Sequence, residues 1–221
     1  MTEHGGTEHH GTEHGGTEHH GTERFGADYW RAHWADADAG GPPPHPALDT
    51  ELAGLAPGTA LDAGSGAGAE AAWLSAHGWN VTAADIATAA PPHLDSAIRW
   101  VEADLTVWEP PHPYDLVTTF YAHPTIGQLA FYERIARWVA PGGTLLIVGH
   151  DQADGHGHEH EHPHSHPADA TADLSGIRTV LAPDAWTIET AERRARTLAD
   201  PRGRAVALRD VVVRARRTGA A

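Results

Sequence analysis

The sequence of 221 residues contains no cysteine and no lysine. Without cysteine the chain has no disulfide, no thiolate metal ligand and no cysteine nucleophile. All fifteen cationic side chains are arginines, and 30 acidic residues bring the formal charge to −15. That charge disfavours nonspecific binding to nucleic acid or to an anionic membrane, so neither is expected as a partner. We interpret the nine arginines between Arg193 and Arg217 as solvating two strands and a turn, with an anionic-ligand site as the alternative.

Long apolar runs are missing as well. No stretch approaches the roughly 18 to 20 apolar residues that are needed to span a bilayer. The N-terminus also lacks the apolar core of a signal peptide. We therefore expect a soluble, cytoplasmic protein.

Histidine, in contrast, is abundant and concentrated in two low-complexity segments. Residues 2–21 are four copies of Thr-Glu-His followed by Gly-Gly or His-Gly. Because this repeat has no aliphatic side chain to bury, residues 1–23 are predicted to be disordered. Neutral imidazoles that alternate along an extended chain bind zinc or nickel weakly, and a solvated linker expanded by repeat slippage is the alternative. The second segment is predicted as a disordered insertion at about 151–170, and its alternating histidines are His156, His158, His160, His162, His164 and His166.

The rest of the chain, from 24 to 217, is predicted to form one α/β domain. Helices are expected near 25–34, 48–55, 70–77, 126–139 and 174–181. Strands are expected at 59–63, 80–84, 98–102, 115–120, 144–148, 186–191 and 205–214. Strands that alternate with helices indicate a doubly wound, mainly parallel sheet, here of seven strands, and the last two strands are predicted to form an antiparallel hairpin.

A glycine loop follows the first predicted strand and carries the main functional signal. Its residues are Gly64, Ser65, Gly66 and Gly68. Glycines at such a place let the chain turn sharply and let a ligand approach the backbone at the start of the next helix. The loop alone does not identify the ligand, because Gly64, Gly66 and Ala69 also match the dinucleotide-binding fingerprint, and a turn that serves packing only is a third interpretation.

Three acidic positions narrow the choice of ligand for the glycine loop. Asp62 lies two residues before the glycines, where a carboxylate suits a cationic methionine tail but repels a pyrophosphate. Asp85 ends the second strand, 21 residues after Gly64, where a carboxylate accepts hydrogen bonds from ribose hydroxyls in both kinds of cofactor site. Asp104, followed by Leu105, comes after the third strand and places an acceptor near an adenine amino group.

The segments LDAGSGAGAEAAWLSAHGWNVTAADIA, VEADLTVW, YDLVTTFY and WVAPGGTLLIVGHD together resemble the class I S-adenosylmethionine-dependent methyltransferases. The likeness covers about 25–217 and is greatest to the bacterial small-molecule branch called tellurite-resistance or thiopurine-methyltransferase-like. It implies a Rossmann-like sheet with an antiparallel last strand, S-adenosylmethionine as methyl donor and a small-molecule acceptor. It also implies that Asp62 and the glycine loop hold the methionine part. Ribose and adenine would be held by Asp85, Ile86, Asp104 and Leu105, under an N-terminal lid that contains Trp30 and Trp34.

Methyl transfer from a sulfonium is an in-line displacement, so a general base is needed only if the acceptor must lose a proton. The candidates follow the fourth strand: Tyr121 and His123. Histidine titrates near neutrality and suits that role, although a histidine that merely lines the cleft is an equal alternative.

One departure from the family is the short crossover between Asp85 and Ile98, which leaves little room for a helix. Two alternatives to a methyltransferase therefore stay open. A nicotinamide-dependent oxidoreductase is disfavoured by Asp62 and by the closing hairpin. A metal-buffering protein whose methyltransferase-like domain is inactive would be consistent with the short crossover.

Overall fold

The structure is a computed structural model that describes residues 26–35, 43–87, 97–151, 171–199 and 205–219. The predicted disordered repeat at 1–23 lies outside these ranges. So do most of the crossover after Asp85 and nearly all of the predicted histidine-rich insertion, including its six alternating histidines. In the described ranges, no helix is both long enough and apolar enough to cross a membrane.

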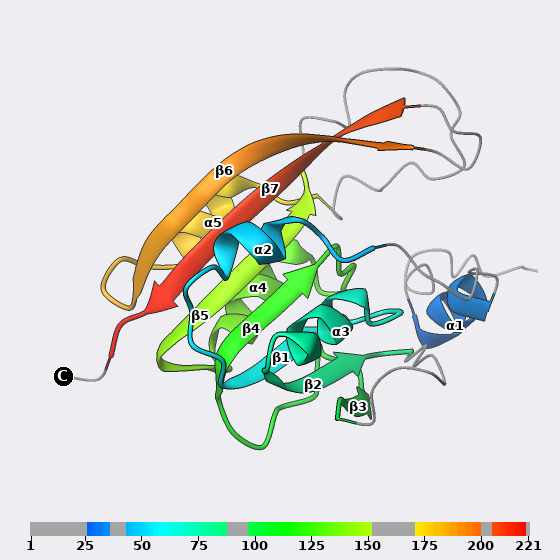
Figure 1. Cartoon of the computed structure of the whole chain (residues 1–221), viewed down its shortest axis with the longest axis horizontal. Helices are drawn as coiled ribbons and strands as arrows, with labels where there is room; N and C mark the ends of the chain where they lie inside the picture. The colour runs from blue at the N-terminus through cyan, green and yellow to red at the C-terminus, as the bar shows by residue number, and fades with distance from the viewer. Residues whose placement is uncertain (1–25, 36–42, 88–96, 152–170, 200–204, 220–221) are drawn as a thin grey trace, which may run out of the picture.

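Seven strands form one sheet in the order β3-β2-β1-β4-β5-β7-β6 (Figure 1), which confirms the predicted fold class. The strands β1 to β5 are parallel, and β7 pairs antiparallel with both β5 and β6. Continuous buried runs in the middle of the sheet explain why these strands were recognisable, since parallel strands are covered on both faces. Their bounds are β1 Thr59–Ala63, β2 Asn80–Asp85, β3 Arg99–Glu102, β4 Tyr114–Phe120, β5 Val139–His150, β6 Trp186–Ala199 and β7 Ala205–Arg217.

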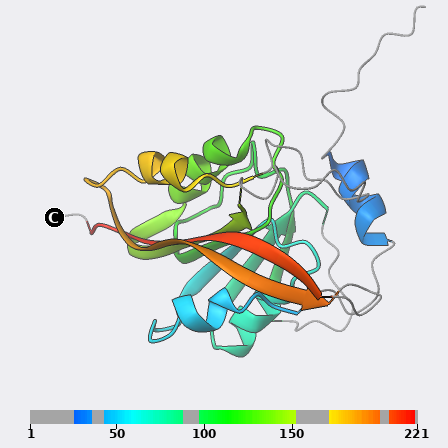
Figure 2. The ribbon, with the colours of Figure 1, turned by 90° about the horizontal axis from the view of Figure 1, so that it is seen from above.

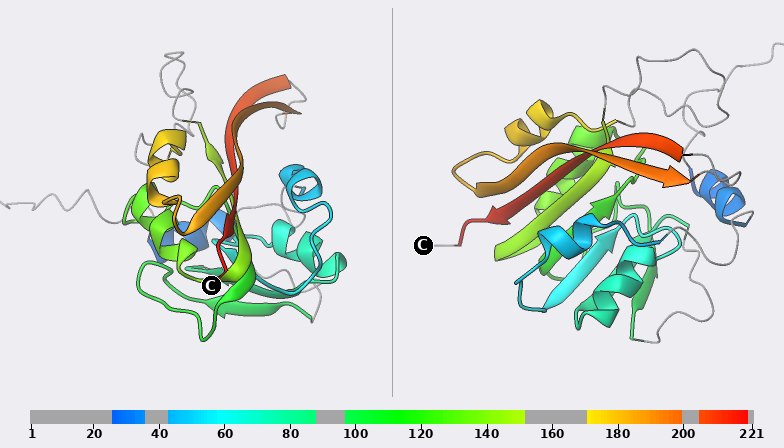
Figure 3. Two further views of the ribbon diagram at one scale, coloured as in Figure 1. Left: turned by 90° about the vertical axis from the view of Figure 1, so that its left-hand side faces the viewer. Right: turned by 45° about the horizontal axis from the view of Figure 1, so that its top comes forward.

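Helices cover both faces of the sheet, and each face has its own apolar core (Figures 2 and 3). The helices are α1 Ala27–Ala35, α2 Ala47–Glu51, α3 Ala69–Ala76, α4 Gln128–Ala136 and α5 Leu174–Val180. Leu48 of α2 and Leu74 of α3 are fully buried on one face, while Ile135 of α4 and Ile177 of α5 are fully buried on the other. The helix α1 lies apart from both layers, beyond the carboxyl ends of the parallel strands (Figure 1).

Several boundaries differ from the sequence prediction: β5 spans Val139–His150 where 144–148 was predicted, and α2 ends at Glu51 where a helix was predicted to reach 55. The helix predicted at 126–139 ends at Ala136, because Trp138 and Val139 already pair with Tyr114 at the start of β4. The hairpin strands are longer than predicted, at 14 and 13 residues. Much of their length is charged and only partly buried, so apolar periodicity did not mark it.

Several arginines of the hairpin form ion pairs rather than a solvated cluster. Arg193 pairs with buried Asp151 at 2.9 Å, and Arg194 pairs with buried Glu51 of α2. Asp151, which the sequence assigned to the insertion, is therefore part of the folded domain. It also forms an isolated parallel bridge with Ala172, so the two ends of the stretch 152–170 lie side by side.

Candidate functional site

The glycine loop between β1 and α3 is held against β2 by its own backbone. The amides of Gly64 and Ser65 both donate to the carbonyl of Ala84, at 2.8 and 3.2 Å. Gly64, Gly66 and Gly68 have φ values of +82°, +47° and +81°, which side chains other than glycine rarely adopt. A Cβ on Gly64 would lie 2.7 Å from the Cβ of Ala122, the second residue after β4. The glycines are therefore required both for the turn and for this close approach.

Asp85, at the end of β2, fixes the middle of the loop. Its Oδ2 accepts from the amide of Gly66 and its Oδ1 from the amide of Ala87, each at 2.9 Å. Burial raises the pKa of the carboxyl above its ordinary value, although these two amides oppose the change. Asp85 therefore supports the glycine loop, and its predicted contact with the ribose stays a prediction.

Asp62, in β1, is buried, with 1% of its surface exposed. Its Oδ1 accepts from the hydroxyl of Thr118 at 3.0 Å, while Oδ2 accepts no hydrogen bond from any described residue. Burial, with the neighbouring charges of Glu70 and Asp85, raises its pKa to about 8. Glu70 lies in the first turn of α3, and burial raises the pKa of its carboxyl as well. The charges of Glu70 and Asp85 disfavour ionisation of Asp62, so this group of acids is complementary to a cation.

The turn after β3 lies beside the end of β2, because the amide of Ala103 donates to the carbonyl of Asp85 at 2.8 Å. Within this turn the Oδ1 of Asp104 accepts from the amide and the hydroxyl of Thr106, at 2.9 and 2.7 Å. Leu105 is 7% exposed and joins the apolar core. The predicted cofactor residues of β1, β2 and β3 thus meet at one edge of the sheet, and half-buried Ile86 lies between them.

The helix α1 reaches across this edge. Trp30 stacks on His123, with ring centroids 5.8 Å apart and an angle of 24° between the planes. Arg31 forms a 2.9 Å salt bridge with Glu102 at the end of β3. These contacts connect α1 to both sides of the glycine loop, which agrees with the position expected of a lid. The backbone of Trp34 belongs to α1, but its side chain is outside the described part of the chain.

Tyr121 begins the turn after β4 and has a φ of +51°, the one positive value at a non-glycine residue of the described chain. Arg196 of β6 donates to its hydroxyl at 2.9 Å and lies over its ring, 5.5 Å from the centroid. Burial and a hydrogen bond to Asp210 raise the pKa of the phenol far above its ordinary value. Tyr121 is therefore neutral near pH 7 and is not suited to act as a general base, which leaves His123 as the candidate for that role.

Asp210 of β7 connects this turn to the chain before α2. It is fully buried and accepts from Nε of Arg196 at 2.5 Å and from Nε2 of His45 at 3.2 Å. The Nδ1 of His45 accepts from the amide of Ala47 at 3.1 Å, so the proton of the neutral ring is on Nε2. Burial opposes ionisation of Asp210, but hydrogen bonds from His45 and Tyr121 and the charge of Arg196 hold its pKa below the ordinary value.

Four residues that surround the site were not singled out from the sequence: His45, Glu70, Arg196 and Asp210. They form a continuous network, because the backbone amide of His45 also donates to Glu70 at 3.1 Å. No short motif contains them, since His45 and Asp210 are 165 positions apart. Glu70 did have a signal, as an acid in the first turn of the helix after the glycine loop.

Metal ligands do not gather in this site. Among the residues that the structure describes, no group of three histidine, aspartate or glutamate side chains is arranged to hold an ion. The predicted metal-binding histidines fall outside those residues, so the prediction stays a prediction.

Comparison with known proteins gives one family and many related folds. A family model described as a methyltransferase domain matches residues 45–200, which is more than half of the chain. No curated protein matches. The chain is similar to the solved structure entitled "Conversion of a Disulfide Bond into a Thioacetal Group during Echinomycin Biosynthesis", with 22% identity, a TM-score of 0.60 and coverage of 88% of this chain and 93% of that one.

Two further solved structures are similar at comparable levels. TehB from Haemophilus influenzae is 17% identical with a TM-score of 0.58, over 86% of this chain and 66% of its own. The 1,6-didemethyltoxoflavin-N1-methyltransferase of Burkholderia thailandensis, solved with 1,6-didemethyltoxoflavin and S-adenosylhomocysteine bound, is 20% identical with a TM-score of 0.53, over 85% and 82%. At these identities the likeness establishes the fold.

Proposed function

The chain belongs to the family of methyltransferase domains, and from this premise we propose that it transfers a methyl group from S-adenosylmethionine to a small molecule. We also propose how its residues hold the donor. The cationic methionine end of the donor lies against Asp62 and the glycine loop. The ribose lies against Asp85, and the adenine lies between Ile86 and the turn of Asp104 and Leu105.

The observation that carries this assignment is the buried oxygen Oδ2 of Asp62, which has no hydrogen-bond partner in the described chain. Ionisation of a buried carboxyl group without a partner is costly, and a cationic group placed beside it offsets that cost. The negative neighbours Glu70 and Asp85 increase the preference for a cation. A nicotinamide dinucleotide would instead bring its anionic pyrophosphate to the same carboxylates, so the electrostatics of the loop disfavour an oxidoreductase.

The donor supplies an electrophilic methyl group on a sulfonium, and the chain's task is to orient the two reactants and keep water out. The glycine loop and Asp85 hold the donor at the carboxyl ends of β1 and β2. The helix α1 covers the same edge of the sheet through the contacts of Trp30 and Arg31. His123 is half-buried and faces Trp30 on one side and His150 on the other, with ring centroids 5.8 and 6.1 Å away.

On the acceptor side we assign His123 as the group that takes a proton when the acceptor has to lose one. The side chains of Tyr121 and Arg196 are held in place beside His123, because both form hydrogen bonds with Asp210. The covering helix and the bound heterocycle of the Burkholderia thailandensis structure both favour an acceptor of small size.

Calorimetric titration with S-adenosylhomocysteine and with NADH tests the donor assignment. We expect micromolar binding of S-adenosylhomocysteine at one equivalent and no binding of NADH. The reverse result would overturn the assignment of the glycine loop. An Asp62→Asn variant should bind S-adenosylhomocysteine at least tenfold more weakly, since a charged hydrogen bond contributes about 1.5 to 3 kcal/mol. Unchanged affinity would mean that Asp62 does not face the methionine end.

A further inference from the structure

A pocket lies at the opposite end of α3 from the glycine loop. Its volume is about 270 Å³, and it opens between α2 and the C-terminal end of α3. Pro57, which precedes β1, and Trp79, which precedes β2, place it at the amino ends of the strands. Trp73 is the lining residue nearest to Gly68 along α3, five residues or about 7.5 Å of helix away, and no residue of the glycine loop lines the pocket. The pocket is therefore distinct from the methyl-transfer site.

One wall of this pocket is a stacked pair of aromatic rings. Trp73 and His77 lie with their centroids 3.6 Å apart and their planes at 16°. The Nδ1 of His77 lies 2.7 Å from the carbonyl oxygen of Trp73, and because a carbonyl only accepts, Nδ1 carries the proton. This bond holds the imidazole ring in place before any ligand arrives and leaves Nε2 as an acceptor.

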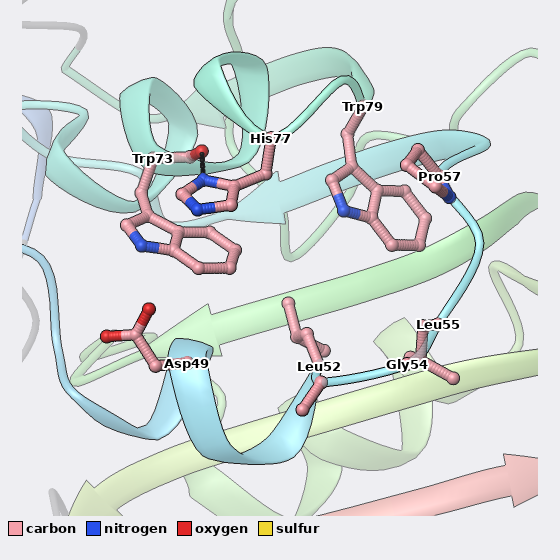
Figure 4. Close-up of a pocket in the computed structure, with 9 residues that line it drawn as sticks. Asp49, Leu52, Gly54, Leu55, Pro57, Trp73, His77 and Trp79 are labelled. Carbon is pink, nitrogen blue, oxygen red and sulfur yellow. Dashed lines mark hydrogen bonds between the residues drawn. The ribbon is translucent and has the colours of Figure 1, made fainter.

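The other walls give the pocket the shape of a slot (Figure 4). Trp73 and Trp79 project toward α2, and Leu52 projects back toward them from the end of α2. Trp79 and Leu52 are buried, 8% and 6% exposed, so both are fixed by the core behind them. A slot between indole rings and an aliphatic side chain accommodates a flat ring.

The charge of the slot selects among flat ligands. Asp49 of α2 lies at one end, near Trp73, and is the one carboxylate that lines it (Figure 4). None of the described lining residues is an arginine, so nothing there balances a ligand anion. Indole faces attract cations through their quadrupole, and the carboxylate adds to that attraction. With the Nδ1 proton held by the carbonyl of Trp73, the Nε2 of His77 is the ring atom that can accept from an N–H group.

We propose that this slot is a binding site for a planar aromatic cation bearing N–H donors, separate from the methyl-transfer site and independent of the function assigned there. The ring stacks against Trp73, and the cationic N–H groups point to Asp49.

The test uses three probes of one shape and different charge: benzamidinium, benzamide and benzoate. Each is titrated by calorimetry into the full chain saturated with S-adenosylhomocysteine, so that the acidic glycine-loop site is filled. We expect one equivalent of benzamidinium to bind, benzamide to bind more weakly, and benzoate to bind at least tenfold more weakly than benzamidinium. Equal binding of benzamidinium and benzoate, or no benzamidinium binding at millimolar concentration, would overturn the proposal.

Variants then locate the binding. Trp73→Ala should weaken benzamidinium binding at least tenfold, and Asp49→Asn should remove most of the preference over benzoate. Asp49 is exposed and Trp73 is partly buried at the border of the core, so the variants should fold, which circular dichroism checks. The matched control is Asp184→Asn, which removes an exposed carboxylate before β6 and should leave binding unchanged. If folded Trp73→Ala binds benzamidinium as the wild type does, or if Asp184→Asn reduces binding as much as Asp49→Asn, the slot is not the site.

Discussion

Asp62 gives the most direct test of the reasoning about the donor site, because its titration should appear in both stability and ligand binding. In the unfolded chain an aspartate ionises near its ordinary pKa of 3.8, whereas burial keeps the folded carboxyl protonated up to a pKa of about 8. Between these two values the folded state holds a proton that the unfolded state has released. The free energy of unfolding therefore falls as the pH rises through this window, by about 1.4 kcal/mol for each pH unit per proton.

Asn in place of Asp62 cannot ionise, so Asp62→Asn should reduce this slope by the contribution of one proton. Some slope should remain, because burial raises the pKa of Glu70 and Asp85 in the same direction. Urea unfolding of the ligand-free protein at several pH values between 5 and 8 measures how the free energy of unfolding depends on pH. Asp184→Asn, at an exposed position, is the control that should keep the full slope.

Ligand binding should show the opposite dependence. The ammonium group of S-adenosylhomocysteine requires the ionised form of Asp62, so binding should release up to one proton below pH 8. The ionised fraction of a group with a pKa of about 8 rises from about 1% at pH 6 to half at pH 8. The affinity should therefore increase up to about fiftyfold over that range. In Asp62→Asn the affinity should be lower and nearly independent of pH.

Calorimetry in two buffers of different ionisation enthalpy counts the protons released on binding. Identical pH profiles for the wild type and Asp62→Asn, with no proton release in either, would refute the idea that Asp62 ionises to receive the donor. A wild-type profile that falls as the pH rises would refute it equally.

Three further predictions follow from single contacts. Asp85→Ala should lower the affinity for S-adenosylhomocysteine at least tenfold in calorimetry. It should also lower the melting temperature, because both carboxylate oxygens accept from loop amides. An unchanged dissociation constant would mean that the carboxylate does not face the ribose. Gly64→Ala should lower the free energy of unfolding in urea by about 1 to 3 kcal/mol more than Gly142→Ala does. Both glycines have φ near +80°, but only Gly64 has a neighbour within 3 Å of the added Cβ. Equal decreases in the two variants would show that Ala122 moves aside without an energetic cost. Deleting residues 1–23 and 155–168 should preserve folding and cofactor binding while removing most zinc or nickel binding at neutral pH, and stoichiometric metal binding by the shortened chain would place the ligands in the folded domain.

The fold was predictable because its signals are local. The central strands are short apolar runs ended by glycine, aspartate or proline, and β1 has the bounds that the sequence predicted. The glycine loop and Asp85 could be placed for the same reason, since the carboxyl ends of adjacent parallel strands meet at one edge of the sheet. The hairpin was less predictable, because residues such as Arg194 and Arg196 are charged and acquire their partners only in the folded state.

The polar network around Tyr121 could not be predicted for a related reason. Each of its members is ordinary in its own segment. Asp210 of β7 acquires its partners only where the fold brings it to Arg196 of the neighbouring strand and to His45 before α2. The strained backbone of Tyr121 was equally invisible, because a φ of +51° in a tyrosine has no sequence signature. Such strain, of about 1 to 3 kcal/mol, persists only where the surroundings determine the conformation, and here the ring is held by Arg196 and the hydroxyl by Asp210.

The hairpin holds both the turn of Tyr121 and the two residues that flank the stretch 152–170. The chain leaves β5 at Asp151 and returns at Ala172, and these two residues pair directly. Asp151 is fully buried and bound to Arg193, so the exit point is fixed by the same hairpin that fixes Tyr121 through Arg196. A segment inserted between two paired residues adds only loop-closure entropy, which grows slowly with length. Expansion or contraction of the histidine-rich stretch should therefore leave the geometry of Asp62, the glycine loop and His123 unchanged.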